Sequence, residues 1–179
     1  MTLRDCTRML RRYTLPALCF CLSTHTISAH ALGAVCTVSS SGMAFGSYQP
    51  LTFAGKLTSA DKTSTANVSV VCTGLLALGG YTISLGPSTY GTGNLISTRY
   101  LNNTTNGGAY MAYNIFTEGT YTTIWGNGTT GSRVTGTSAL ILGTSTNNHT
   151  VYGKVPAGQN TLKAGSFSDS LTMTLTYSP

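Results

Sequence analysis

The stretch SFSDSLTMTLTY, residues 166–177, alternates apolar and polar side chains over most of its length. Its apolar positions, all on one face, are Phe167, Leu171, Met173, Leu175 and Tyr177. Serine or threonine fills the opposite face, and the one charge on the apolar face is Asp169, which we expect at a rim or paired with a turn amide. A period of two with aromatic and aliphatic residues predicts a half-buried β-strand.

The same alternation recurs along the chain, at 66–72, 81–85 and 111–115. Turn-forming pairs such as Gly79-Gly80, Asn106-Gly107 and Asn127-Gly128 separate these runs. No window carries a sustained apolar stripe of helical period, and residues 86–109 are predicted to form a long surface loop. Short strands with frequent turns predict an all-β fold, an antiparallel β-sandwich.

The N-terminal residues have the layout of a secretory signal peptide. Four arginines within residues 1–12 precede a short apolar run at 13–22, and the small-residue motif Ala29-His30-Ala31 follows. We therefore predict a signal peptide over 1–31, cleaved after Ala31, and one β-sandwich domain over 32–179. A buried core helix or a membrane anchor is the alternative, although the run is too short to span a bilayer and contains Pro16.

Cleavage would leave two of the five cysteines, Cys36 and Cys72, in an oxidising compartment. A bridge between them would close a loop of about 36 residues and stabilise the fold by about 3–4 kcal/mol. Two buried free thiols are the alternative. A metal site is not expected, because two cysteines and the distant His149 supply too few ligands.

The predicted mature chain carries few charges, with six basic residues against three acidic ones and hence a net charge of +3. The basic residues are scattered singly, so nucleic acid is not an expected partner. The surface must be covered by serine, threonine, asparagine and glycine, which gives little repulsion between copies. Such a surface suits a protein that sits in an assembly.

Catalytic motifs are not found. A serine–histidine–acid site would have to combine His149 with an acid such as Asp169, and the chain has neither a nucleophile elbow nor a phosphate-binding loop. Tyrosines at alternating strand positions are expected in the core or on a sheet face rather than as a sugar platform. We therefore expect no catalytic residues, no cofactor and no metal.

Several short segments, taken in order, resemble the spore coat protein U family, which also includes subunits of archaic chaperone–usher pili. The segments are CTV at 36–38, MAFGSY at 43–48, NVSVVC at 67–72, RYL at 99–101, YNIF at 113–116, TIWG at 123–126, YGKVPAGQ at 152–159 and GSFSDSL at 165–171. The resemblance covers nearly all of 35–177. It implies an incomplete immunoglobulin-like sandwich, pilin-like and lacking its last strand, with a disulfide at Cys36 and Cys72.

An incomplete sandwich has an exposed edge and an open apolar groove that invite a strand from another chain. The sequence ends two residues beyond Tyr177, so no further strand is expected after it. Cleavage after Ala31 would leave only residues 32–35 before Cys36, which span about 13 Å and are too few to fill a neighbour's groove. A cleavage site nearer Ser23 would restore a short donor strand.

We therefore expect an exported, non-catalytic structural protein without a membrane span, which passes through the periplasm to the spore or cell surface. The first hypothesis is a spore coat component. The alternative is a subunit of an archaic chaperone–usher pilus acting in adhesion or biofilm formation, terminal because it lacks a donor. Its partners would be other coat or pilus subunits, joined by strand addition, and in the pilus branch a periplasmic chaperone and usher. A secreted enzyme or lectin on the same scaffold is a third hypothesis.

Overall fold

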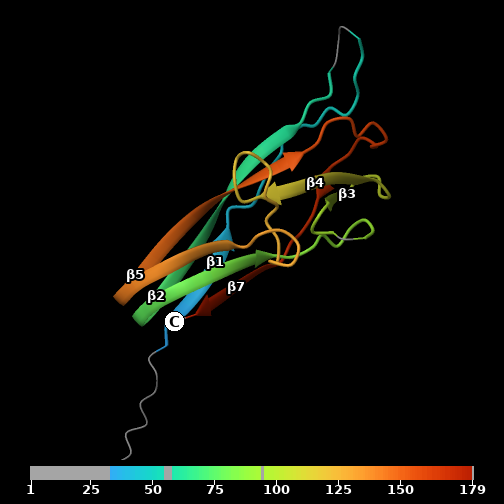
Figure 1. Cartoon of the computed structure of the whole chain (residues 1–179). Coiled ribbons are helices and arrows are strands. Elements are labelled where there is room, and N and C mark those ends of the chain that lie inside the picture. The colour runs from blue at the N-terminus through green and yellow to red at the C-terminus, as the bar shows by residue number, and fades with distance from the viewer. Residues whose placement is uncertain (1–32, 55–57, 94, 179) are drawn as a thin grey trace, which may run out of the picture. The chain divides into compact units, whose positions relative to one another are not determined.

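The computed structural model describes residues 33–54, 58–93 and 95–178, with the backbone alone at 75–78 and 140 (Figure 1). The predicted signal peptide and its cleavage site after Ala31 lie outside these residues. Within them, no helix is long and apolar enough to cross a membrane.

The described part of the chain is built from antiparallel β-strands. In chain order they are β1 (Val35–Ser40), β2 (Lys62–Leu85), β3 (Arg99–Asn103), β4 (Tyr110–Phe116), β5 (Val134–Val155), β6 (Phe167–Ser168) and β7 (Met173–Ser178). They form one hydrogen-bonded sheet in the order β1-β2-β5-β4-β3-β6, and β7 pairs with β2. The all-β antiparallel prediction is confirmed.

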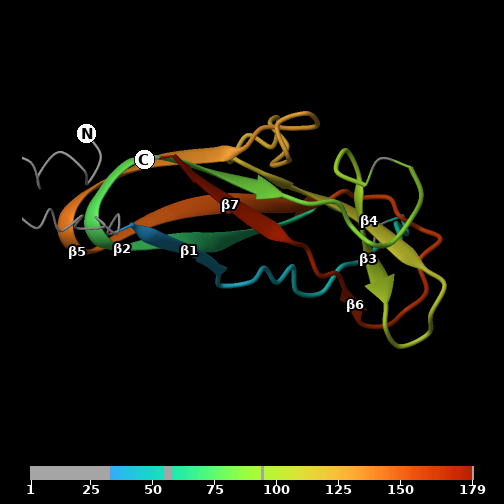
Figure 2. The same ribbon diagram turned by 90° about the horizontal axis from the view of Figure 1, so that it is seen from below.

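A long two-stranded ribbon of β2 and β5 folds over to make both layers of the sandwich (Figure 2). The strands pair from Lys62↔Val155 to Ile83↔Val134. At the bend Gly74, Gly79 and Gly143 have φ of 133°, 153° and 112°, backbone that other residues rarely adopt. The edge strand β1 pairs with the part of β2 before the bend, where Cys36 is opposite Cys72. The edge strand β7 pairs with the part of β2 after the bend, where Leu175 is opposite Ile83.

The core lies between the two layers, where the inward side chains of β2 are buried. Val68, Val70 and Ile83 are fully buried, and the Trp125 indole N–H donates to the Ile83 carbonyl at 2.9 Å. A second cluster forms under β3 and β4 around Met111, Tyr113 and Val155. Leu171, just before β7, packs against both clusters.

A buried arginine joins the end of β2 to β4 and to the loop that follows β4. The Arg99 guanidinium donates to the carbonyls of Gly86 and Trp125, both at 2.9 Å, and to the side-chain oxygen of Asn114 at 2.6 Å. Burial lowers the pKa of Arg99 to about 10, so the group stays charged at neutral pH. Its hydrogen bonds satisfy that buried charge.

Three predictions about strand limits need correction. The strand predicted over 166–177 is interrupted at 169–172 and forms two strands with different partners, because β6 pairs with β3 and β7 with β2. The strand expected to end at Cys72 continues through the glycine-rich bend to Leu85, because β5 pairs with it along its whole length. The segment 86–109, expected to be loop, contains β3, and Leu101 of this strand faces inward. The short length of β3 hides its alternation in the sequence.

Candidate functional site

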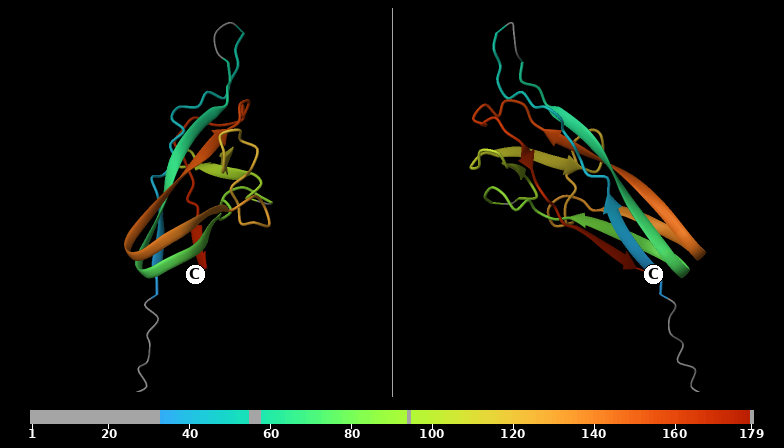
Figure 3. Two further views of the ribbon diagram at one scale, coloured as in Figure 1. Left: turned by 60° about the vertical axis from the view of Figure 1, so that its left-hand side comes forward. Right: turned by 180° about the vertical axis from the view of Figure 1, so that it is seen from behind.

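The two edge strands β1 and β7 each have one edge that no other described strand covers. Among the described residues each pairs with β2 alone, so the backbone groups along its other edge have no strand partner. In the rear view of Figure 3, β1 in blue and β7 in dark red lie on the same side of the molecule, and the two strands contact each other. Such edges are templates for pairing with a further strand.

The inward side chains of these two strands are incompletely covered. Val38 of β1 and Met173, Leu175 and Tyr177 of β7 are only partly buried, although all pack against the core. By contrast, Val70 on the inner strand β2 is fully buried. The half-buried row of large apolar groups is what a sandwich with one strand absent from its surface would leave.

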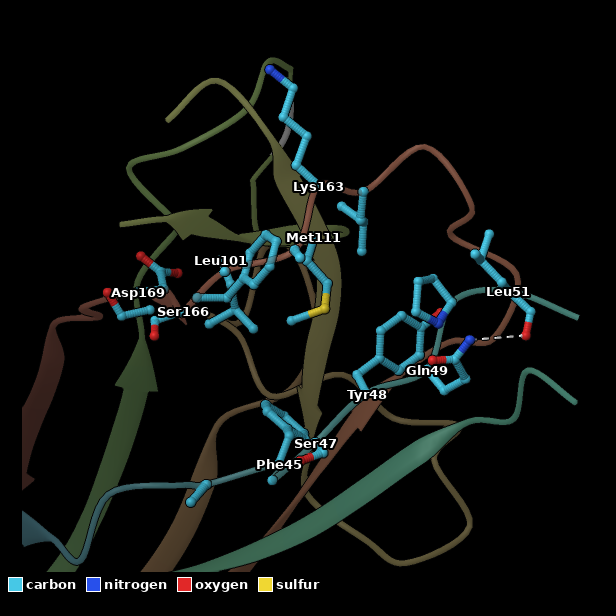
Figure 4. Close-up of a pocket in the computed structure, with 18 of the residues that line it drawn as sticks. Phe45, Ser47, Tyr48, Gln49, Leu51, Leu101, Met111, Lys163, Ser166 and Asp169 are labelled. Atoms are coloured by element: carbon cyan, nitrogen blue, oxygen red, sulfur yellow. Dashed lines mark hydrogen bonds between the residues drawn. The ribbon is translucent and has the colours of Figure 1, made fainter. Parts of the chain in front are cut away.

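Next to the second core cluster lies a cavity of about 920 Å³, which both apolar and polar side chains line (Figure 4). One wall is the segment 43–51 that follows β1, and the other is the segment 160–169 that precedes β7. Leu101 and Met111 also line it. The walls continue β1 and β7 along the chain, so we treat the strand edges and this cavity as one site, the β1–β7 groove.

The wall after β1 is held against the sheet by a glycine and a tyrosine. Gly153 leaves the space that Met43 and Phe45 fill, because a Cβ at this position would overlap both side chains. The Tyr48 hydroxyl donates to the Pro156 carbonyl at 2.8 Å and accepts from the Gln159 amide at 3.2 Å. This wall is therefore anchored and not a loose loop.

Amide side chains hold the residues around the opposite wall. Gln159 donates to and accepts from the backbone of Ala112, at 3.0 and 2.7 Å, in the manner of a pairing strand. The buried Asn103 side chain donates to the Lys163 and Ala164 carbonyls and accepts from the Thr105 and Asn106 amides.

Asp169 is the acidic residue of the cavity lining. Its carboxylate accepts from the Tyr113 hydroxyl at 2.7 Å and from the Ser170 amide at 2.8 Å, as expected for a rim residue paired with a turn amide. Burial, together with the hydrogen bond to Asp169, raises the pKa of Tyr113, so the phenol remains a neutral donor. Lys163, which is exposed, is the other charged residue of the cavity lining.

Both predicted disulfide residues are brought together beside this groove. Cys36 and Cys72 are directly opposite in the β1–β2 ladder and form a disulfide, as predicted. Partly buried Cys36 belongs to the inward row of β1. Phe45 and Leu101 lie in segments that carry the family resemblance, but the sequence did not indicate that they and Leu162 line one cavity.

The residues of a conceivable catalytic site have other partners. The His149 imidazole bonds the Tyr81 hydroxyl at 2.7 Å, whereas Asp169 is engaged by Tyr113. Over the described ranges no group of three or more histidine, cysteine, aspartate or glutamate side chains is placed to hold a metal ion.

A family model described as the Spore Coat Protein U domain matches residues 22–174. No curated protein matches the chain.

Two solved structures are similar at low identity. One is the complex of the chaperone CsuC with the tip adhesion subunit CsuE from archaic chaperone–usher Csu pili of Acinetobacter baumannii, with 19% identity and a TM-score of 0.48. It covers 79% of this chain and 39% of that chain. The other is a chaperone–tip adhesin complex of CFA/I fimbriae biogenesis, with 12% identity, a TM-score of 0.40, and coverage of 74% and 39%. This chain thus spans about two fifths of the length of each matched chain. At these identities and TM-scores, no structural detail is transferred from either structure to this chain.

Proposed function

The chain belongs to the spore coat protein U domain family, whose members are non-catalytic structural proteins, and from this membership we propose that it is an exported subunit of a surface assembly. Each copy accepts a β-strand from another subunit in the β1–β7 groove. The observation that carries the proposal is the half-buried apolar row of β7, Met173, Leu175 and Tyr177, beside a strand edge without a partner among the described residues.

Strand addition satisfies both features of the groove at once. The backbone of the added strand bonds the free edges of β1 and β7, and its alternate side chains cover the apolar row. The cavity of about 920 Å³ accepts larger side chains at the end of the groove near Phe167. A subunit with this groove empty would expose apolar surface. The expected partners are therefore a periplasmic chaperone that covers the groove, and an usher at which the chaperone is replaced by the strand of another subunit.

The contact made in this way is head-to-tail, because the groove of one copy receives a segment from a different part of the next. Head-to-tail contacts that do not close into a ring produce filaments. This geometry favours a pilus subunit acting in adhesion or biofilm formation, and so reverses the order that the sequence favoured.

A spore coat component is the second candidate, and the description of the matching family supports it. A coat can use the same strand addition between subunits. Electron microscopy of producing cells would separate the two, because a pilus subunit labels filaments and a coat subunit labels a continuous layer on spores.

The family match bears on whether the chain also donates a strand. The match begins at residue 22, so residues 22–31 of the expected signal peptide lie inside it. Cleavage upstream of these residues would leave up to thirteen residues before Val35, about 43 Å when extended, which is long enough to fill a groove. Mass spectrometry of the mature N-terminus would distinguish a terminal subunit from a shaft subunit. A mature chain that starts near residue 32 supports a terminal subunit, and one that starts near residue 22 supports a shaft subunit.

A matched pair of substitutions on β7 tests strand acceptance. Leu175→Asp places a carboxylate on the inward row, and Thr174→Asp places the same charge on the exposed face one residue away. We expect the native protein and the Thr174 variant to enter multi-subunit surface material, and the Leu175 variant to remain in the periplasm. Equal assembly of both variants, each shown to be folded, would contradict the proposal.

A further inference from the structure

A small hollow opens on the outer face of the sheet formed by β4 and β5, away from the β1–β7 groove. It has a volume of about 240 Å³, and Phe116, Tyr121, Ile124 and Lys154 are among its lining residues. Phe116 lies opposite Tyr152, and both strands turn their core residues to the other face. Ala112, with its small side chain, also lines the hollow.

Tyr121 at the rim has an unusual backbone conformation. Among the described residues it is the only non-glycine residue with positive φ, at 56°. The carboxylate of Glu118 holds the turn by accepting from the amides of Thr122 and Thr123, at 2.8 and 2.7 Å. Such conformations persist where the surroundings enforce them and are concentrated at functional sites.

This turn sets the Tyr121 ring in an aromatic group. Its centroid lies 5.7 Å from that of Phe116 and 6.4 Å from that of Tyr152, both edge-to-face. All three side chains are partly exposed. The group therefore presents aromatic surface to solvent.

The one cation of the hollow is neutralised. The Lys154 ammonium lies 5.9 Å from the Tyr121 ring centroid and 2.6 Å from the Asp61 carboxylate. A charged ligand would therefore have to compete with an existing ion pair. The hollow favours a neutral ligand that combines apolar surface with hydrogen-bonding groups.

A second aromatic group lies next to the hollow on the same face. Tyr100 of β3 is directly opposite Ala112, and its ring centroid lies 6.4 Å from that of Tyr110, which is 47% exposed. Tyr90 stacks on Tyr110 at 6.2 Å. Aromatic surface thus continues from the hollow along β4, as an extended ligand would need.

We propose that this face, the aromatic groups around Tyr121 and Tyr110 with the hollow between them, binds a neutral polysaccharide chain. A sugar ring presents a flat C–H face that stacks on aromatic rings and an edge of hydroxyls that hydrogen-bond to polar side chains such as Lys154. The hollow is below the roughly 300–1,000 Å³ of pockets for drug-sized ligands, which suits one ring of a longer chain. This inference goes beyond the proposed strand acceptance and uses a different face of the molecule.

Tyr121→Gly is the informative variant, because it removes the ring while glycine adopts positive φ without strain. Phe53→Ala is the matched control, since it removes a 55% exposed aromatic side chain outside the hollow. Affinity electrophoresis through native gels containing hydroxyethylcellulose, dextran, galactomannan or laminarin measures binding. Thermal unfolding of each variant verifies its fold.

We expect at least one of these polysaccharides to retard the native protein and the Phe53 variant equally. Loss of the Tyr121 ring should weaken that binding about tenfold while the variant still unfolds cooperatively. No retardation of the native protein by any of them, or equal retardation of the Tyr121 variant, would overturn the proposal. The groove variant Leu175→Asp should bind as the native protein does, so failure of strand acceptance and failure of glycan binding are distinguishable.

Discussion

The Tyr81 hydroxyl and the Nε2 atom of His149 lie 2.7 Å apart and link the two layers of the folded ribbon. Tyr81 lies in the part of β2 that follows the bend. His149 lies in the part of β5 that pairs with β2 ahead of the bend. Gly136, opposite Tyr81, leaves the space that its ring occupies, because a Cβ there would overlap the hydroxyl. The pair therefore fixes the spacing of the layers near the bend.

Acid should weaken the fold through His149. Burial lowers the pKa of His149 below its ordinary 6.5, so the unfolded chain takes up this proton more readily than the folded one. Stability from this group is fully present above pH 6.5 and is lost as the pH falls through the lower folded pKa. Urea unfolding between pH 7.5 and 5.5 should show this loss, and His149→Gln should flatten it. An equal slope in both proteins would refute the assignment.

Removal of the buried guanidinium should be far more damaging than removal of an exposed one. Arg99→Leu leaves the carbonyls of Gly86 and Trp125 without their donor, and should lower the free energy of unfolding by more than about 3 kcal/mol. Arg133→Leu is the control, because Arg133 is exposed and should cost below about 1 kcal/mol. Chemical denaturation measures both, and similar losses would count against the role given to Arg99.

The disulfide should contribute stability through the loop that it closes. Replacement of both Cys36 and Cys72 by serine opens a span of 36 residues and should cost about 4 kcal/mol in urea unfolding. Alkylation of the exported native protein without reductant should label no thiol among these two cysteines. Labelling of both would show that the bridge does not form in the exported protein.

The turn that carries Tyr121 should be sensitive to acid in a different range. Burial acts to raise the pKa of Glu118, but hydrogen bonds from Thr122, Thr123 and Thr117 outweigh it and hold the pKa at about 2. Its contribution is present above pH 4.5 and is lost as the pH falls toward 2. Glu118→Gln should therefore lose less stability than the native protein over this interval, as measured by thermal unfolding. A steeper loss in the variant would contradict this.

The sequence predicts strands well where one face of the strand is buried and the other is exposed to solvent. The alternation of Met173, Leu175 and Tyr177 is confirmed residue by residue in the burial of β7, although the strand predicted over 166–177 begins there only at Met173. The bridge between Cys36 and Cys72 is confirmed as well. The strand prediction depends on local alternation and the disulfide prediction on the number of cysteines, and both properties can be read from a single sequence.

Features that depend on pairing distant segments were harder to predict. The continuation of β2 through Gly74 and Gly79 results from its pairing with β5, and no local signal marks it. The cavity beside Leu101 is lined by residues 43–51 and 160–169, which are more than 100 positions apart in the sequence. The open groove was inferred from a family resemblance, since alternation alone does not distinguish an edge strand from an inner one.

The most direct test of the account is hydrogen exchange along β7, Met173–Ser178, in the isolated subunit and in native surface assemblies. Amides of β7 that point away from β2 have no strand partner among the described residues, so they should exchange rapidly in the subunit. An added strand should protect them, so we predict that their exchange slows by orders of magnitude in the assembly while the inner strand β2 changes little. Equal exchange along β7 in the two states would contradict strand addition at this groove.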